Sequence, residues 1–338
     1  MSVQVDSDFD SGNIEVLSID DHEINLKICD DPYPKYTKQK YNYWFYFKVS
    51  NIRGKRLKYN IKKIRNYENS WGGFRVAMSY DNKIWTRHST KLLGDQLTWV
   101  LKSKKNHVWF AYYVPHPFSR TKKMFKNSEI IGYSRNRNPI YMKTYGVGDK
   151  YIWIVARQHP GETIGSWILE GFMRKMKYLR KAYTIKIIAN ANPDGTILGY
   201  WRLNKAGINL NRDWKKEKSP EVRCIKKVMM REERGWDLCF DLHGDEAAFK
   251  HFVVRDDTAG PLEDHIYELL KTDRFQAHHP SEHYSTAHGG TLGNRTGFAW
   301  LHPICIEGAM KHLLNGNKTL QEEPIKVGER LAMMMLKF

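Results

Sequence analysis

The chain has 338 residues, of which 41% are hydrophobic and 13% aromatic. This composition indicates a globular protein with a sizeable core and excludes an intrinsically disordered chain. No apolar run approaches the roughly 18 residues that a membrane-spanning helix needs, and the acidic, polar N-terminal residues do not resemble a secretory signal.

The net charge of +18 is concentrated in one segment. Residues 51–150 carry 22 basic and 5 acidic side chains, a net charge of +17, whereas residues 1–50 carry −4 and residues 151–338 carry +5. Such a field attracts anionic partners, although a basic face that only keeps the protein in solution is equally compatible with it. The four cysteines are widely spaced without a CxxC pair, which is typical of reduced thiols and predicts a cytoplasmic location.

Residues 1–118 predict an all-β sandwich domain. Residues 41–64 are rich in aromatic and β-branched side chains, as strands are. Residues 72–88 have the pattern of a hairpin, and residues 107–117 that of a further strand which two prolines end. Because no helical period of useful length occurs, we expect strands throughout this domain.

Residues 119–338 predict an α/β domain. The run 151–156 is continuously apolar, as in a strand that is covered on both faces, and residues 162–181 place apolar side chains at helical spacing. Strand and helix patterns alternate through the rest of the chain. This alternation predicts a sheet flanked by helices, with functional groups at the carboxyl ends of its strands.

Two histidines and a glutamate follow the ends of predicted strands. His159 and Glu162 flank a Pro-Gly pair after the strand 151–156, and His243 ends a second apolar strand. Taken singly, these residues are more typical of a structural turn and of a buried histidine than of metal ligands. Together they form a His₂Glu set, the kind that holds a catalytic zinc ion and leaves one position open. Asp241 faces the same side as His243 and is a candidate partner for it, or a plain strand-end carboxylate.

A second group of polar residues could act on a substrate. Arg202, Asn211 and Arg212 lie in a segment otherwise rich in turn residues, where a guanidinium could bind a carboxylate or an oxyanion. In so basic a chain, ordinary surface arginines are the alternative. Glu307 ends a buried strand, where a carboxylate is costly without a partner, and it is a candidate general base.

The order of these motifs resembles the zinc carboxypeptidases of the M14 family, and within it the cytosolic carboxypeptidase subfamily. The resemblance extends from about residue 9 to about residue 315 and so covers nearly the whole chain. The motifs that carry it are FDSGN (Phe9–Asn13), WFYFKVSN (Trp44–Asn51), HPGET (His159–Thr163), NPDG (Asn192–Gly195), Trp201-Arg202, LNRDW (Leu210–Trp214) and DLHG (Asp241–Gly244).

The resemblance implies a zinc-dependent exopeptidase that hydrolyses the last peptide bond of its substrate. One zinc ion per chain would be held by His159, Glu162 and His243. Glu307 would take a proton from the water that zinc activates and pass it to the leaving amine. Arg202 would polarise the scissile carbonyl and stabilise the oxyanion.

The resemblance also implies how the substrate binds. Asn211 and Arg212 would bind its terminal carboxylate, Tyr284 is the candidate substrate-binding tyrosine, and Arg295 is the candidate cation for an acidic side chain. Eukaryotic members of the subfamily remove glutamate from acidic tails of tubulin and other proteins. The basic segment 51–150 is consistent with such partners, whereas nucleic acid is not the expected one.

Two alternatives remain open from the sequence. One is a related zinc amidohydrolase that acts on cell-wall peptides or acylated amino acids. The other is a metal-less relative that only binds acidic polymers through its basic face. The complete ligand set together with Glu307 favours the carboxypeptidase.

Overall fold

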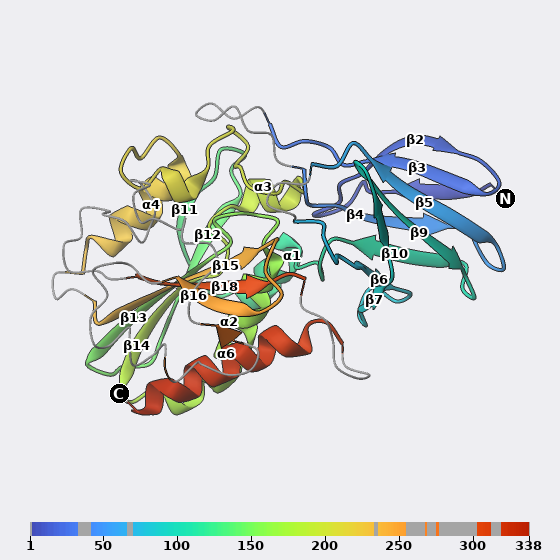
Figure 1. The fold of residues 1–338 in the computed structure, drawn as a ribbon. Coiled ribbons are helices and arrows are strands. Elements are labelled where there is room, and N and C mark those ends of the chain that lie inside the picture. Colours follow the sequence, from blue (N-terminus) through green and yellow to red (C-terminus); the bar gives the residue numbers. More distant parts are fainter. Residues whose placement is uncertain are drawn as a thin grey trace.

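The computed structural model describes residues 2–32, 42–65, 70–232, 236–254, 268, 275–276, 303–311 and 319–337. Among these residues, ten strands in the first third of the chain form two five-stranded sheets. The strands are β1 (Gln4–Asp6), β2 (Glu15–Ile19), β3 (Glu23–Lys27), β4 (Tyr46–Ser50), β5 (Arg56–Lys62), β6 (Val76–Ser79), β7 (Thr86–His88), β8 (Lys91–Leu93), β9 (Gln96–Lys102) and β10 (His107–Ala111). One sheet has the order β1-β4-β10-β6-β7 and the other β2-β3-β5-β9-β8 (Figure 1). All described neighbours are antiparallel except β3 and β5. The prediction of a β-rich N-terminal part is confirmed.

Aromatic side chains fill the space between these two sheets. Tyr59 of β5 and Trp99 of β9 stack, with ring centroids 5.3 Å apart. Both rings contact Phe110 of β10 in the other sheet, at centroid distances of 4.9 and 5.1 Å. Such aromatic pairs contribute about 0.5–1.5 kcal/mol each beyond the area they bury. The aromatic-rich strands of the sequence therefore form the core of a sandwich.

The later strands form one eight-stranded mixed sheet. They are β11 (Glu129–Tyr133), β12 (Pro139–Tyr145), β13 (Lys150–Ala156), β14 (Tyr183–Ile188), β15 (Leu238–Asp245), β16 (His251–Val254), β17 (Phe275–Gln276) and β18 (Pro303–Ala309). Their order is β11-β12-β14-β13-β15-β18-β16-β17, and the central strands β14, β13, β15 and β18 are parallel.

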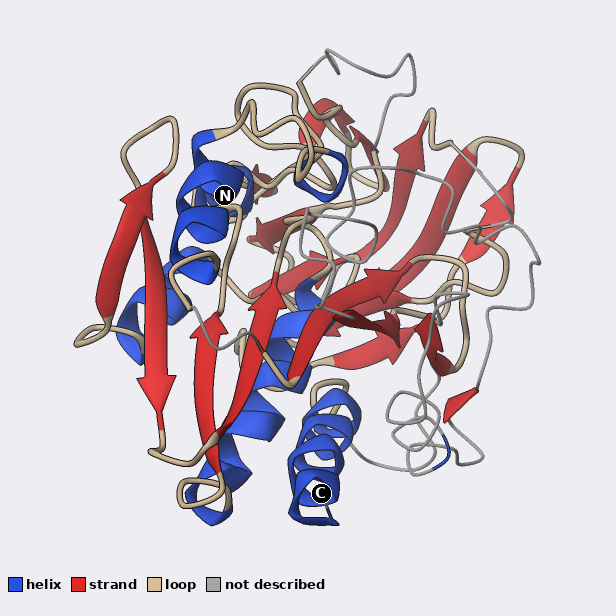
Figure 2. Cartoon of the chain, turned by 90° about the vertical axis from the view of Figure 1, so that its left-hand side faces the viewer, coloured by secondary structure: helices blue, strands red, loops and turns tan. Residues whose placement is uncertain are grey.

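Helices cover both faces of this sheet, which confirms the predicted α/β fold (Figures 1 and 2). The described helices are α1 (Phe118–Met124), α2 (Thr163–Lys175), α3 (Pro193–Ile197), α4 (Pro220–Met229) and α6 (Glu322–Met334), with 3₁₀ turns at Met176–Tyr178, Leu210–Arg212 and Met335–Lys337. None of the described helices is long and apolar enough to cross a membrane.

Strand β13 is buried on both faces, as its unbroken apolar sequence predicts. Ile152 and Ile154 belong to the hydrophobic cluster that includes α2 and α6, whereas Trp153 and Val155 pack in a second cluster with residues of α4. Successive side chains of a strand point to opposite faces, so this alternation follows from the period of two. β13 is therefore a central strand, and the turn after it lies at the middle of the sheet edge.

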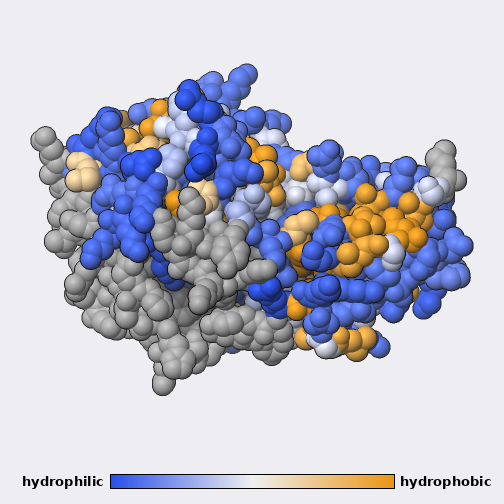
Figure 3. Space-filling model, turned by 90° about the horizontal axis from the view of Figure 1, so that it is seen from above, coloured by the Kyte–Doolittle hydropathy of each residue, from blue (hydrophilic) through white to orange (hydrophobic). Residues whose placement is uncertain are grey.

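The N-terminal sandwich contacts the carboxyl edge of the large sheet. Tyr112, which directly follows β10, donates a hydrogen bond of 3.4 Å to the carbonyl oxygen of Glu246, the residue after β15. The first hydrophobic cluster also runs without a break from the sandwich into the α/β part. The face seen from above in Figure 3 carries apolar side chains over the sandwich, and β2 contributes the exposed residues Val16, Leu17 and Ile19 to the described surface.

Helices α2 and α6 pack so closely that glycines are required at their contact. A Cβ atom on Gly171 of α2 would lie 1.9 Å from the carbonyl oxygen of Ile325, and one on Gly328 of α6 would lie 1.8 Å from that of Ile168. These neighbours are backbone atoms, which cannot turn aside as a side chain can. The two helices can therefore pack at this distance only with glycine at both positions.

We predict that Gly328→Ala lowers the free energy of unfolding by about 1–3 kcal/mol, because the added methyl group forces the two helices apart. Urea denaturation followed by circular dichroism measures this change. Lys326→Ala, at an exposed position of the same helix, is the control and should change stability by less than about 0.5 kcal/mol. Equal stability of the two variants would contradict the packing described for α2 and α6.

Candidate metal centre and active site

The turn after β13 brings a histidine and a glutamate to one point. Arg157 directly follows the strand and has a φ of +61°, in the left-handed region, so the extended conformation ends there. Gly161 follows where a side chain has no room, since a Cβ atom there would lie 2.4 Å from the ring of Trp201. α2 then begins at Thr163. As a result His159 and Glu162, which are 3% and 4% exposed, face the same buried space.

The second histidine comes from the neighbouring strand. β13 pairs in parallel with β15, so that Ala156 lies opposite Leu242 and the side chain of His243 follows at the same sheet edge. The Glu162 carboxylate lies between the two rings, with Oε1 2.7 Å from Nδ1 of His159 and Oε2 2.8 Å from Nδ1 of His243. One ligand atom from each residue lies within 4.8 Å of the other two. Three donors for one metal ion therefore converge.

The other ring nitrogen of each histidine also has a partner. Nε2 of His159 lies 3.1 Å from Oδ1 of Asn209, and Nε2 of His243 lies 3.0 Å from Oδ2 of Asp241. Asp241 in turn accepts hydrogen bonds of 2.8 Å at both carboxylate oxygens from Nε2 of Gln158. Such contacts fix the ring orientation, so both Nδ1 atoms are held towards the centre of the group.

The electrostatics of the group suit a cation. Burial, with Arg202 nearby, lowers the pKa of His159 to about 4, so this ring is neutral. Burial alone would raise the pKa of Glu162, but the two histidines outweigh it and hold that pKa well below its usual range. Burial also opposes charge on His243, yet Asp241 and Glu162 raise its pKa well above the ordinary value. Asp241 and Glu162 therefore favour a positive charge at this site, which a zinc ion would supply.

Glu307 lies directly beside His243. β18 pairs in parallel with β15, and His243 is the residue opposite Glu307 in that register. The side chain is 7% exposed, and its Oε1 lies 3.6 Å from the thiol of Cys305. Burial raises the pKa of Glu307 well above its ordinary value; His243 opposes the shift, and carboxylates such as Glu162 add to it. These surroundings therefore strengthen the tendency of the Glu307 carboxylate to accept a proton.

The structure also brings the predicted arginine and asparagine to this centre. Nη1 of Arg202 lies 3.9 Å from Oε1 of Glu162. Nδ2 of Asn211 lies 3.3 Å from Nε2 of His243, and Nη1 of Arg212 donates a hydrogen bond of 2.7 Å to the carbonyl oxygen of Asn211. These contacts place side-chain donors beside Glu162 and His243.

Other predicted and unpredicted residues complete the description. Tyr284 and Arg295 lie outside the residues that the structure describes. Gln158 and Asn209 were not predicted, although Gln158 directly precedes His159 and Asn209 directly precedes the LNRDW motif, so their position next to motifs was the available signal.

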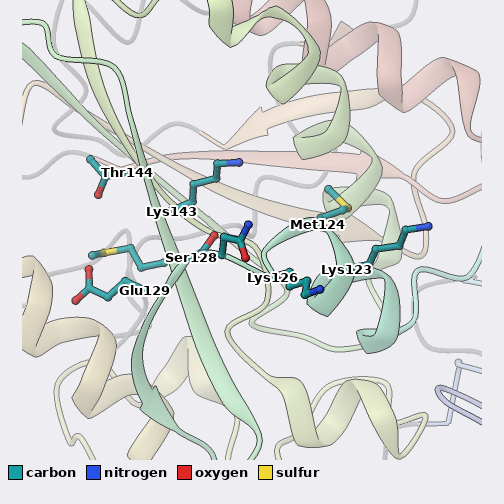
Figure 4. A pocket seen from close by; sticks show the side chains of 9 residues that line it. Lys123, Met124, Lys126, Ser128, Glu129, Lys143 and Thr144 are labelled. Atoms are coloured by element: carbon teal, nitrogen blue, oxygen red, sulfur yellow. The ribbon is translucent and has the colours of Figure 1, made fainter.

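A separate hollow of about 500 Å³ lies between the end of α1 and the strands β11 and β12 (Figure 4). Its lining includes Lys123, Lys126 and Lys143, and it contains none of the residues predicted for the active site. The four cysteines of the chain are free.

Comparison with known families agrees with both parts of the fold. Residues 5–113 match the cytosolic carboxypeptidase N-terminal domain, and residues 120–294 match the zinc carboxypeptidase family. The chain is 31% identical over 268 residues to an uncharacterized protein of Zymomonas mobilis, covering 73% of this chain and 69% of that protein. It is 26% identical over 290 residues to cytosolic carboxypeptidase 3 of Mus musculus, covering 70% of this chain but only 28% of the mouse protein.

Solved structures show the same architecture. A metallo-carboxypeptidase from Pseudomonas aeruginosa, in complex with (2-guanidinoethylmercapto)succinic acid, superposes with a TM-score of 0.86 at 27% identity and covers 98% of each chain. A putative carboxypeptidase from Burkholderia mallei has a TM-score of 0.88 at 24% identity, covering 100% of this chain and 97% of its own. Sequence, fold and the grouped residues agree. The chain therefore belongs to the zinc carboxypeptidase family, among the members that carry the cytosolic carboxypeptidase N-terminal domain.

Proposed function

We propose that the chain is a zinc-dependent carboxypeptidase that removes residues from the C-terminus of peptides or protein tails. The single observation that carries the proposal is the convergence of His159, Glu162 and His243, with Glu307 in register beside His243. One zinc ion per chain would be held by the first three residues. When bound, such an ion lowers the pKa of water and polarises a carbonyl oxygen.

The residues around this centre have chemistry that fits peptide-bond hydrolysis. Glu307, whose pKa is raised, would take the proton of the attacking water and deliver it to the leaving amine. Arg202 would donate to the scissile carbonyl oxygen as negative charge develops on it. Asn211 and Arg212 would bind the terminal carboxylate, so that a chain continuing past this point lacks the group they recognise.

Acidic C-terminal residues are the substrate class that we propose. The net charge of +17 between residues 51 and 150 would attract acidic tails, and Arg295 would bind the acidic side chain. The names of the cytosolic relatives also support a cytoplasmic location. The ligand of the Pseudomonas enzyme carries the carboxylates of a succinic acid, which supports recognition of carboxylate groups in this fold.

A basic C-terminal residue is the second candidate, and Glu246 favours it. This carboxyl group follows β15, and burial together with Asp245 raises its pKa to about 8 while Arg202 lowers it. The positive charge of a bound basic side chain would lower that pKa, so that Glu246 would ionise and pair with it. The ligand of the Pseudomonas enzyme also carries a guanidino group.

The catalytic role of Glu307 predicts the behaviour of Glu307→Gln. The amide cannot accept the proton, so kcat should fall by roughly 10²–10⁴-fold while zinc content stays at one per chain. Steady-state kinetics and metal analysis measure both quantities. Glu129→Gln, at an exposed position, is the control with unchanged kcat. A Glu307→Gln variant with the wild-type kcat would exclude this residue as the base.

Removal of the metal should abolish activity and lower the thermal unfolding temperature, because a ligand that binds only the folded state stabilises it. Adding zinc to the chelated protein should restore both, with saturation near one zinc per chain. His243→Ala should lose zinc binding, whereas His22→Ala, at an exposed position, should bind as the wild type does. Full activity after chelation would contradict a zinc enzyme.

A panel of peptides that differ only in the C-terminal residue separates the two substrate classes. We expect Glu and Asp to be released with a kcat/KM at least about tenfold above that of Lys, Arg and Leu, which corresponds to ~1.4 kcal/mol in the transition state. Release of Lys and Arg as the fastest residues would replace the acidic proposal with the basic one.

A further inference from the structure

One carboxylate of the N-terminal sandwich binds the backbone of the segment that carries Arg202. Asp31 follows β3 and is 7% exposed. Its Oδ1 accepts a hydrogen bond of 2.6 Å from the backbone N–H of Trp201, and its Oδ2 accepts bonds of 2.6 and 2.8 Å from those of Arg202 and Leu203. Three successive N–H groups of the α/β part therefore converge on one side chain of the sandwich.

A buried carboxylate at this place has a cost that the three bonds only partly offset. Burial raises the pKa of Asp31 to about 7, although the three N–H groups and the nearby Arg202 lower it. Hydrogen bonds to a charged acceptor are roughly twice as strong as neutral ones. The same segment could have been held by apolar packing alone, so a carboxylate that fixes three N–H directions points to a need for accurate placement.

The segment held by Asp31 also contacts the turn that carries His159 and Glu162. The carbonyl oxygen of Trp201 accepts a hydrogen bond of 2.9 Å from the N–H of Gly161. The ring of Trp201 lies against Gly161 on one side, and its centroid lies 5.3 Å from Tyr43 and 5.4 Å from Tyr112 of the sandwich. Residue 201 is thus fixed from the sandwich and fixes the turn between His159 and Glu162.

Further hydrogen bonds from the sandwich hold the residues that precede this segment. Asn13 of the FDSGN motif donates a hydrogen bond of 2.7 Å from Nδ2 to the carbonyl oxygen of Gly199, and the N–H of Ser11 donates one of 3.0 Å to that of Ile197. Oδ1 of Asn13 also accepts from the N–H of Cys29, two residues before Asp31. The motif and Asp31 together hold residues 197–203 along their length.

We propose that Asp31 is a positioning residue for catalysis, through which the N-terminal sandwich sets the place of Arg202 beside Glu162. The inference rests on the role proposed for Arg202 in the zinc carboxypeptidase reaction. The sandwich would thus contribute to the active site of its own chain. Without the sandwich, the segment 197–203 would lose the groups that hold its backbone. The Arg202 guanidinium would then lose its fixed distance to the scissile carbonyl.

Hydrogen exchange tests whether Asp31 holds the backbone of residues 197–203, and this readout does not depend on activity. In Asp31→Asn the amide nitrogen faces backbone N–H groups, so amides in the peptide covering 197–203 should exchange about tenfold faster than in the wild type. Asp30→Asn, which removes an exposed neighbouring carboxylate, is the matched control and should exchange at the wild-type rate. Unchanged exchange in Asp31→Asn would overturn the inference.

Kinetics test the consequence. Asp31→Asn should keep one zinc per chain and a KM within about twofold of the wild type, while kcat falls by about 10–100-fold because the misplacement acts on the transition state. In an Arg202→Lys background the same change should cost less than about threefold, since the two residues act as one unit. A wild-type kcat, or the same loss in both backgrounds, would overturn the inference.

Two further measurements keep these outcomes separate. Asp31→Glu retains the negative charge, but its longer side chain should still reduce kcat in folded, zinc-loaded protein. If Asp31→Asn does not fold, this variant decides the question. A wild-type kcat in Asp31→Glu would overturn the inference. If the wild-type protein itself shows no chelator-sensitive carboxypeptidase activity, the proposed function fails. The exchange experiment still tests whether Asp31 holds the backbone of residues 197–203.

Discussion

The Glu162 carboxylate, held between the Nδ1 atoms of His159 and His243 at 2.7 and 2.8 Å, is the interaction on which the site depends. All three groups are at least 96% buried, so their charges are weakly screened. An isolated carboxylate in such a place would be protonated or would destabilise the fold. The partners that keep Glu162 ionised also define a place for a positive charge. A zinc ion with one carboxylate and two imidazole ligands satisfies this requirement directly.

The fold delivers these groups through sheet register and close backbone contacts. Parallel pairing of β13 with β15 and of β15 with β18 aligns the ends of three strands. It therefore brings the turn that carries His159 and Glu162 to the same sheet edge as His243 and Glu307. The turn after β13 requires Gly161 against Trp201, and Trp201 is in turn packed against the sandwich. The position of the site is therefore a property of the whole chain, since the sandwich and the α/β part meet at it.

Much of this arrangement could be predicted because its signals are local. The pair His159 and Glu162 and the strand-end residues His243 and Glu307 are each marked by a few neighbouring residues, and parallel strands bring such ends together. The resemblance to cytosolic carboxypeptidases supplied the accessory β-domain and is confirmed by the family matches. The roles of individual residues remain proposals, and Tyr284 and Arg295 lie outside the described part of the chain.

The rest could not be predicted because it depends on contacts between distant residues. Asp31 meets Trp201 across 170 positions of sequence, and nothing near Asp31 marks it as a partner of that segment. Gln158 reaches Asp241 across 83 positions. β4 and β5 are separated by a short turn, yet they lie in different sheets, because packing between sheets decides their partners and local propensity does not.

The most direct test of the central claim is X-ray absorption at the zinc edge of the purified, zinc-loaded protein. Two imidazole nitrogens at about 2.0–2.1 Å and carboxylate oxygen at about 2.0–2.2 Å are the ligands that His159, Glu162 and His243 predict. Glu162→Gln should lose tight zinc binding, because one of the three ligands then lacks its negative charge. Sulfur at about 2.3 Å, or a spectrum without imidazole, would place the ion elsewhere and contradict the account.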